Sequence, residues 1–299
     1  MFEQILDNVY IVSPTGKGNF PSTYTFYIDD EVKTIIDTPI DTRFVDFFVD
    51  RPLDMILNTH FHRDHSGSNH LFPDAKVYAH HLDTPAMQSV DVFSDFYGFN
   101  EPGNSHIKEA FLPWFNFVPS HITGHIKDEE IIDLGKTKLE VIHTPGHTPG
   151  HCAFFDREKS ILFSGDIDLT GFGPWYGNLV SNVDDVIKSI EKLIDLKPQT
   201  ILSAHKGVID NNATEELKKY LAKVYSNENK IISALAKPLT LEELTEKKVI
   251  YGKWGEPTLM FYYFEKLSLE RHLERLIGLG IVQKDGDVYY VAQEKSISI

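Results

Sequence analysis

Short apolar segments separated by turn residues run through the first part of the chain. Their β-branched and aromatic side chains predict strands, and the first three are expected to form an antiparallel meander. The segments cover residues 8–12, 23–28, 33–37, 55–59 and 76–79. A helix is expected between the third and fourth of them, from about Asp41 to Val49. The first part of the chain therefore predicts a sheet with helical cover.

The same pattern returns in the second half of the chain. Strands are expected over 138–143, 161–164 and 200–203, and an amphipathic helix over 183–196. Each of these strands ends at a polar cluster, and loops at strand ends are where α/β folds place their chemistry. Two strand-rich halves of this kind predict an α/β fold, a four-layer αββα sandwich over residues 1–213, with a site between the halves.

Residues 84–125 interrupt this alternation with a segment rich in Phe, Trp, Pro and Gly that shows little periodicity. We interpret the segment as an insertion that forms a lid or a binding loop. Its aromatic side chains are candidates for lining a substrate pocket, although packing onto the body is their commoner role. They are Phe93, Phe96, Tyr97, Phe99, Phe111, Trp114, Phe115 and Phe117.

The remainder of the chain, residues 214–299, is richer in helical patterns. A hairpin is expected over 280–291, with its turn at Asp285-Gly286. Three helices and a closing hairpin predict a small winged-helix-like domain. Its segment 269–279 balances basic against acidic side chains and forms no basic stripe, so nucleic-acid binding is not expected. We expect this domain to cover the pocket or to form a homodimer.

Composition and charge narrow the class of protein. A hydrophobic fraction of 41% suits a soluble globular chain. The net charge of -15 repels polyanions and attracts metal cations. The lone Cys152 cannot pair within the chain, which fits a reducing compartment. No secretory signal or membrane-spanning apolar run is apparent, so we expect a cytoplasmic protein without membrane contact.

Four potential metal ligands lie close together, directly after the strand expected over 55–59. They are His60, His62, Asp64 and His65. Alternate side chains of an extended segment share a face, so His60 and His62 can hold one ion. Asp64 and His65, beyond the bend, can reach a second ion. Packing does not explain this density, because crowded imidazoles and a carboxylate are costly to bury without a partner.

Three further ligands come singly from later strand ends. His147 lies on a tight turn between two Pro-Gly pairs, which aims its side chain. Asp166 and His205 each end an expected strand. His143 and His151 flank the His147 turn and are expected to support the ligands rather than to bind metal. Each signal is weak alone, but successive strand ends that deliver ligands predict a metal site.

Residues 60–65 match the His-x-His-x-Asp-His signature of the metallo-β-lactamase superfamily, which the chain resembles over about residues 5–210. Residues 59–67 are most similar to the glyoxalase II branch, the hydroxyacylglutathione hydrolases, whereas the C-terminal domain is similar to that of the endoribonuclease branch. The resemblance implies a bridging Asp166 and two metal positions. One is implied to be held by His60, His62 and His147, and the other by Asp64, His65 and His205.

A donor set of imidazoles and carboxylates favours zinc, two ions per chain, with iron or manganese as alternatives. A hydroxide held between two such ions is a strong nucleophile at neutral pH. We expect it to attack a small carbonyl substrate, a thioester first and a lactone next. Asp64 is the candidate for proton transfer. Tyr176, in the glycine- and aromatic-rich segment beyond Asp166, is the candidate for stabilising the oxyanion.

Two other activities fit the same motifs. Persulfide dioxygenases resemble the chain at every ligand position but use a single iron on the equivalents of His60, His147 and Asp166. A phosphodiesterase or endoribonuclease activity is favoured only by the C-terminal domain. No cluster of basic residues that could bind glutathione is evident, so the sequence does not identify the leaving group of the reaction.

Overall fold

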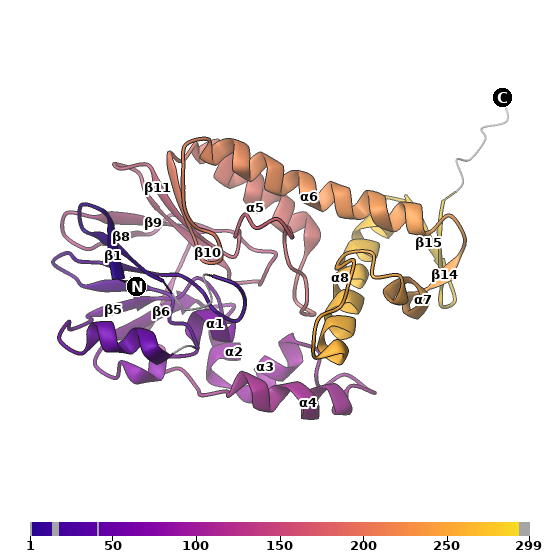
Figure 1. Cartoon of the computed structure of the whole chain (residues 1–299), viewed down its shortest axis with the longest axis horizontal. Coiled ribbons are helices and arrows are strands. Elements are labelled where there is room, and N and C mark those ends of the chain that lie inside the picture. Colours follow the sequence, from indigo (N-terminus) through magenta and orange to yellow (C-terminus); the bar gives the residue numbers. More distant parts are fainter. Residues whose placement is uncertain (1, 14–17, 41, 293–299) are drawn as a thin grey trace.

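The computed structural model describes residues 2–13, 18–40 and 42–292. Two stacked β-sheets form the body, helices cover both outer faces, and the helical C-terminal part lies at one end (Figure 1). This arrangement confirms the α/β sandwich that the strand pattern predicts. Among the described residues, no helix combines the length and the apolar character needed to cross a membrane.

The first sheet is built from the N-terminal strands in sequence order. Pairing is antiparallel from β1 to β4 and parallel from β4 to β7. The strands are β1 (Phe2–Leu6), β2 (Val9–Val12), β3 (Thr25–Ile28), β4 (Thr34–Ile36), β5 (Met55–Leu57), β6 (Lys76–His80) and β7 (Gly124–Ile126). The helix expected over 41–49 is the 3-10 helix η1 (Thr42–Phe48), which packs Phe44 and Phe48 on the outer face.

The second sheet contains the later strands in the order β13-β12-β11-β10-β9-β8. They are β8 (Ile131–Asp133), β9 (Lys138–His143), β10 (Cys152–Asp156), β11 (Ile161–Gly165), β12 (Thr200–Ser203) and β13 (Gly207–Asp210). Its outer face is covered by α5 (Val183–Leu196) and α6 (Ala213–Ala234). Asn182 caps α5 by accepting a hydrogen bond from the Asp185 amide.

The space between the sheets is filled by apolar side chains from alternate strand positions. Ile11 and Phe26 of the first sheet share one buried cluster with Val141, Phe154 and Phe163 of the second. The rings of Phe26 and Phe163 meet edge to face, with centroids 5.7 Å apart. Burial of this shared apolar surface joins the sheets and fixes their strand ends relative to each other.

The segment 84–125 is helical, contrary to the expectation of an irregular insertion. It forms α2 (Thr84–Gln88), α3 (Val90–Phe96) and α4 (Ser105–Phe115). Ile107, Phe111 and Phe115 recur every fourth residue and form the buried stripe of α4. Phe93, Phe99 and Phe111 pack in the core of this segment, so most of its aromatic side chains are structural.

The C-terminal part contains α7 (Leu241–Glu246) and α8 (Thr258–Gly278). The hairpin expected over 280–291 is confirmed as β15 (Val282–Asp285) and β16 (Val288–Val291), and β14 (Leu239–Thr240) pairs with β16. α8 packs on the segment 84–125, where the Tyr263 hydroxyl donates to the Tyr97 carbonyl oxygen at 2.8 Å. A winged-helix assignment for this part stays a prediction.

α6 contributes to two cores. Leu217, Tyr220 and Val224 in its first half pack with α5 against the second sheet. Ile231 near its end packs instead with α7, α8 and the hairpin. The expected domain boundary at residue 213 therefore falls at the start of a helix that joins the sandwich to the C-terminal part.

Four histidines gather where β6 and β9 end. The rings of His80 and His143 stack across the two sheets, with centroids 4.2 Å apart. His81 lies 4.4 Å from His80 by the same measure, and His125 lies 6.5 Å from His81. Burial, followed by the charges of His143 and His81, lowers the pKa of His80 to about 4. His80 is therefore neutral in the folded protein at pH values where an exposed histidine is protonated.

The stability of the protein should fall as the pH is lowered from 6.5 toward 4. Over this window the unfolded chain binds a proton at His80 and the folded chain does not, so protonation favours unfolding. Urea denaturation of the His80→Asn variant should show a loss between pH 7 and 4.5 that is smaller by roughly 1–2 kcal/mol than in the parent. The exposed His106→Asn variant is the control, and equal pH profiles for parent and His80→Asn would contradict the prediction.

Candidate metal centre

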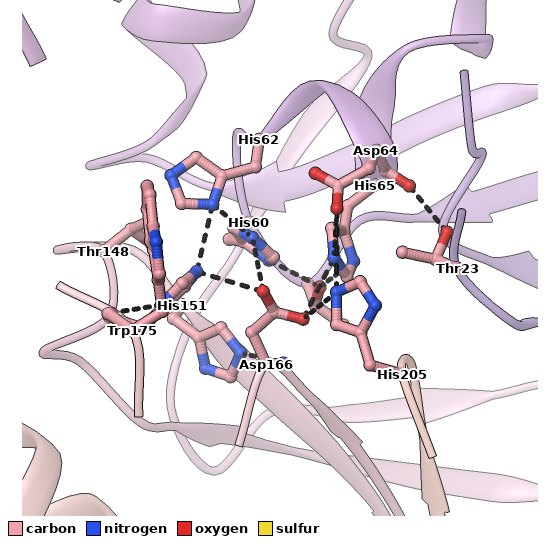
Figure 2. A network of polar contacts seen from close by, with 12 residues as sticks. Thr23, His60, His62, Asp64, His65, Thr148, His151, Asp166, Trp175 and His205 are labelled. Carbon is pink, nitrogen blue, oxygen red and sulfur yellow. Dashed lines mark hydrogen bonds and ion pairs between the residues drawn. The ribbon is translucent and has the colours of Figure 1, made fainter. Parts of the chain in front are cut away.

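The potential ligands all follow the ends of strands, at the edge where the two sheets meet. His60 and His62 lie in the loop after β5, and His62 precedes α1 (Arg63–Ser66), which carries Asp64 and His65. His147 lies in the turn between β9 and β10, whereas Asp166 follows β11 and His205 follows β12. Figure 2 shows the convergence of the ligands that it labels, which come from both sheets: His60, His62, Asp64, His65, Asp166 and His205.

The ligand atoms form two neighbouring groups. One contains His60, His62, His147 and Asp166, and the other contains Asp64, His65 and His205. Asp166 faces both groups, because its Oδ2 lies 3.2 Å from His147 Nε2 and its Oδ1 lies 3.0 Å from His65 Nε2 and 3.3 Å from His205 Nε2. One carboxylate thus directs an oxygen to each group (Figure 2).

Hydrogen bonds on the second ring nitrogen orient several of the imidazoles. His147 Nδ1 donates to the Trp175 carbonyl oxygen at 3.1 Å, and His205 Nδ1 donates to the Gly18 carbonyl oxygen at 2.7 Å. His65 Nδ1 lies 2.7 Å from Asp37 Oδ2. These bonds place a proton on Nδ1 and leave Nε2 facing the centre, as supporting residues do in metal sites.

Two buried carboxylates that the sequence analysis missed hold the ligand loops. Asp37, directly after β4, accepts hydrogen bonds from the Thr59 amide and hydroxyl as well as facing His65. Asp83 accepts from the Phe61 amide at 3.0 Å, the Thr148 hydroxyl at 2.6 Å and the Gly150 amide at 2.6 Å. Asp83 therefore ties the loop of His60 and His62 to the turn that carries His147.

Arg63 anchors the same loop on its other side. Its guanidinium is buried and donates to the carbonyl oxygens of Phe115, Asn116, Val118 and Gly67. Burial lowers its pKa to about 10, so it stays charged at neutral pH. The ligand loop and the end of α4 are thus held together by a single side chain.

The other residues near the centre have supporting positions. His151 Nε2 accepts a hydrogen bond from the Asp166 amide at 3.0 Å, and its Nδ1 lies 2.8 Å from the Thr144 hydroxyl. Asn178, which sequence analysis missed, donates to the His147 carbonyl oxygen and lies 3.3 Å from His62 Nε2. His143 stacks on His80 and is not part of either group.

The charge states of the ligands follow from burial and from each other. Burial, together with neighbouring imidazoles, lowers the pKa of His60 and of His62 well below its usual value. Burial lowers the pKa of His205, but the carboxylates of Asp166, Asp64 and Asp168 together outweigh burial and raise this pKa to about 9. The first two imidazoles are thus neutral, which is the form that binds a cation. His205 holds a proton that a bound cation would displace.

The arrangement fits a pair of metal cations. His60 Nε2 and His147 Nε2 lie 2.9 and 3.0 Å from His62 Nδ1, an approach of ring nitrogens that a shared cation stabilises. His65 Nε2 and Asp166 Oδ1 are buried and lie 3.0 Å apart, and neither makes a hydrogen bond of good geometry among the described residues. A cation bound between them would satisfy both atoms, and donors of nitrogen and oxygen suit zinc, iron or manganese.

A cavity of about 390 Å³ opens onto the centre. Its floor includes His62, Asp64, Asp166 and His205. Aromatic and apolar side chains from the segment 84–125, from the loop after β11 and from α8 form much of its wall. Of the aromatic residues proposed to line a pocket, Tyr97 and Phe115 do so.

The structure places Tyr176, the residue expected to stabilise the oxyanion, away from the cavity. Its side chain is buried in the core beneath α5 and α6 and its ring packs against His272, with centroids 5.0 Å apart. It does not line the cavity, whereas the preceding residue, Trp175, does. Successive side chains of an extended segment point in opposite directions, so the residue beside the expected one faces the centre.

Comparison with known proteins was made on sequence and on structure. A curated bovine relative (Bos taurus), the acyl-coenzyme A thioesterase MBLAC2, is 32% identical over 49% of this chain and 52% of its own length. The match therefore spans only about half of that relative. The hydroxyacylglutathione hydrolase GloC of Haemophilus influenzae is 29% identical over 53% of the chain and 71% of its own length.

Solved structures extend the likeness of the fold to nearly the whole chain. The metallo-beta-lactamase family protein TTHA1429 of Thermus thermophilus superposes with a TM-score of 0.78 and 22% identity, covering 96% of this chain and all of its own. A beta-lactamase domain protein of Burkholderia ambifaria gives a TM-score of 0.74 at 17% identity, covering 97% of this chain and 93% of its own.

The model of one protein family matches this sequence from residue 18 to residue 205, a range that includes every ligand of both groups. That family is described as the metallo-beta-lactamase superfamily. The match covers more than half of the chain, and the sheets that carry the ligands are those of the superposed structures. The chain belongs to the metallo-β-lactamase superfamily.

Proposed function

We propose that the protein is a metal-dependent hydrolase that cleaves thioesters. The observation that carries the proposal is the position of Asp166, whose two carboxylate oxygens each face one group of ligands. The names of MBLAC2 and GloC both describe release of an acyl group from a thiol carrier, which supports a thioester over other carbonyl substrates.

Bound metal would supply a Lewis acid and a water of lowered pKa, and zinc is the proposed ion. Residues of the chain would hold the ions in place. His60, His62 and His147 would hold one ion, Asp64, His65 and His205 the other, and Asp166 both.

The substrate would enter the cavity, whose floor carries the ligands and whose wall is largely aromatic and apolar. Asp64 lies on that floor, and its Oδ2 atom is 3.6 Å from His205 Nε2. We assign to this oxygen the transfer of a proton from the attacking water to the leaving group. The buried position of Asp64 limits exchange of that proton with solvent.

The purified protein should contain two zinc ions per chain by elemental analysis. The Asp166→Ala variant should lose most of both, because the carboxylate serves the two groups at once. An exposed histidine outside the centre gives the matched control, since His81→Ala removes an imidazole without touching either group. Equal metal content in the parent and in Asp166→Ala would contradict the dinuclear site. About one iron per chain in the parent would instead favour a persulfide dioxygenase, which oxygen uptake with persulfides would test.

The rate of thioester hydrolysis, measured as release of the free thiol, should fall by different amounts in two variants. Asp166→Ala should abolish turnover. Asp37→Asn should lower kcat/KM by about 10- to 100-fold, as loss of a supporting hydrogen bond does at metal sites. Asparagine suits the left-handed backbone of Asp37, at φ 63°, but its amide has one acceptor oxygen in place of two. Its NH2 group would therefore face either the Thr59 amide or His65 Nδ1, each of which now donates to a carboxylate oxygen.

Chelation should remove activity and added zinc should restore it in the parent. The circular dichroism spectrum of Asp37→Asn should match that of the parent, which separates a positioning effect from unfolding. Full activity of Asp166→Ala on every thioester would refute the proposed function.

A further inference from the structure

The wall of the cavity is aromatic on the side of His62. The Trp175 ring lies 5.4 Å from the His62 ring and meets Phe264 of α8 at 5.1 Å, measured between centroids. Met260 and Phe261 of the same helix also line the cavity. The chain therefore surrounds one ligand of the centre with apolar surface from segments that are far apart in sequence.

The polar atom of this wall is already engaged. The indole Nε1 of Trp175 donates to the Tyr251 hydroxyl at 2.9 Å, and both residues line the cavity. Tyr251 in turn packs on Phe172, with centroids 4.9 Å apart. Phe172 and Phe20 line the cavity and remain 37% and 51% exposed, which continues the apolar surface toward solvent.

Acidic groups predominate among the described residues that line the cavity. Asp64, Asp166 and Asp168 lie along it, and the one described cationic group is His205 at the floor, since none of these residues is a lysine or an arginine. A carboxylate or phosphate on the bound part of a substrate would lack a cationic partner on the wall and would be desolvated beside aromatic rings. Two metal ions at the floor would balance the carboxylates that bind them, but they would not extend to the wall.

We propose that the protein selects substrates with an uncharged, apolar acyl group, and that α8 of the C-terminal part sets the length of the acyl group that fits. The inference deepens the proposed function and rests on it. The acyl chain lies against Trp175, Phe264 and Met260, with its carbonyl carbon at the floor. A volume of about 390 Å³ lies within the range of small-molecule sites.

The test uses thioesters of N-acetylcysteamine, a neutral carrier, with acyl groups from acetyl to dodecanoyl. Each methylene that enters the cavity should raise kcat/KM about three- to fourfold until the cavity is full. Succinyl thioester, similar in length to pentanoyl but negatively charged, should react at least about tenfold more slowly than pentanoyl.

Variants of Met260 test the part assigned to α8. Met260→Phe should shift the optimum to shorter acyl groups, and Met260→Ala should shift it to longer ones. Ile277→Phe, an exposed position on the same helix away from the cavity, is the matched control and should keep the parent's profile. Because the two Met260 variants change volume in opposite directions, misfolding of one leaves the other informative.

A binding measurement separates the inference from the proposed function. Straight-chain 2-alkanones cannot be hydrolysed, and their Kd by calorimetry should fall about three- to fourfold per methylene. Chain-length dependence of binding without turnover of any thioester would overturn the proposed function and support the apolar site. A flat profile in both turnover and binding, or the same optimum in parent and both Met260 variants, would overturn the inference alone.

Discussion

The rest of the centre depends on the contacts that the carboxylate of Asp166 makes with imidazoles of both groups of ligands. Its oxygens lie 3.0 to 3.3 Å from imidazole nitrogens in both groups, and nearly all of these side chains are buried. Burying carboxylates and imidazoles together is unfavourable unless charges are balanced and lone pairs are satisfied. The surrounding structure meets this constraint with rigid strand ends and with Asp37 and Asp83, which hold the ligand loops at fixed separations.

Much of the fold and of the centre could be predicted from the sequence. The strands β5, β11 and β12 each end within three residues of a ligand, at Leu57, Gly165 and Ser203. A dense cluster of histidines has few explanations other than a bound cation. Asp37 follows its strand in the same way as Asp166, so the rule that located Asp166 could also have located Asp37. Asp83 and Asn178 carry no such signal, because their roles arise from contacts between segments 22 to 116 residues apart.

The sequence alone could not show which of two neighbouring aromatic residues faces the cavity. Tyr176 and Trp175 are equally plausible lining residues by type, and only the direction of the backbone decides which one meets the centre. The helices of segment 84–125 were missed for a different reason. Ile107, Phe111 and Phe115 are spaced four residues apart, which indicates a helix, but Pro113 and neighbouring aromatic residues obscure this pattern.

The sharing of α6 between two cores has a consequence for how the chain can change. Its first half completes the cover of the second sheet and its second half packs with α7 and α8, so the C-terminal part is not an appendage. Removing everything after residue 213 would uncover the sandwich as well as open the cavity. Substitutions on the inner face of α8, by contrast, leave every metal-facing side chain in place. If α8 sets the length of the acyl group as proposed, the residues that bind metal and the residues that set this length lie on separate stretches of sequence, which can diverge at different rates.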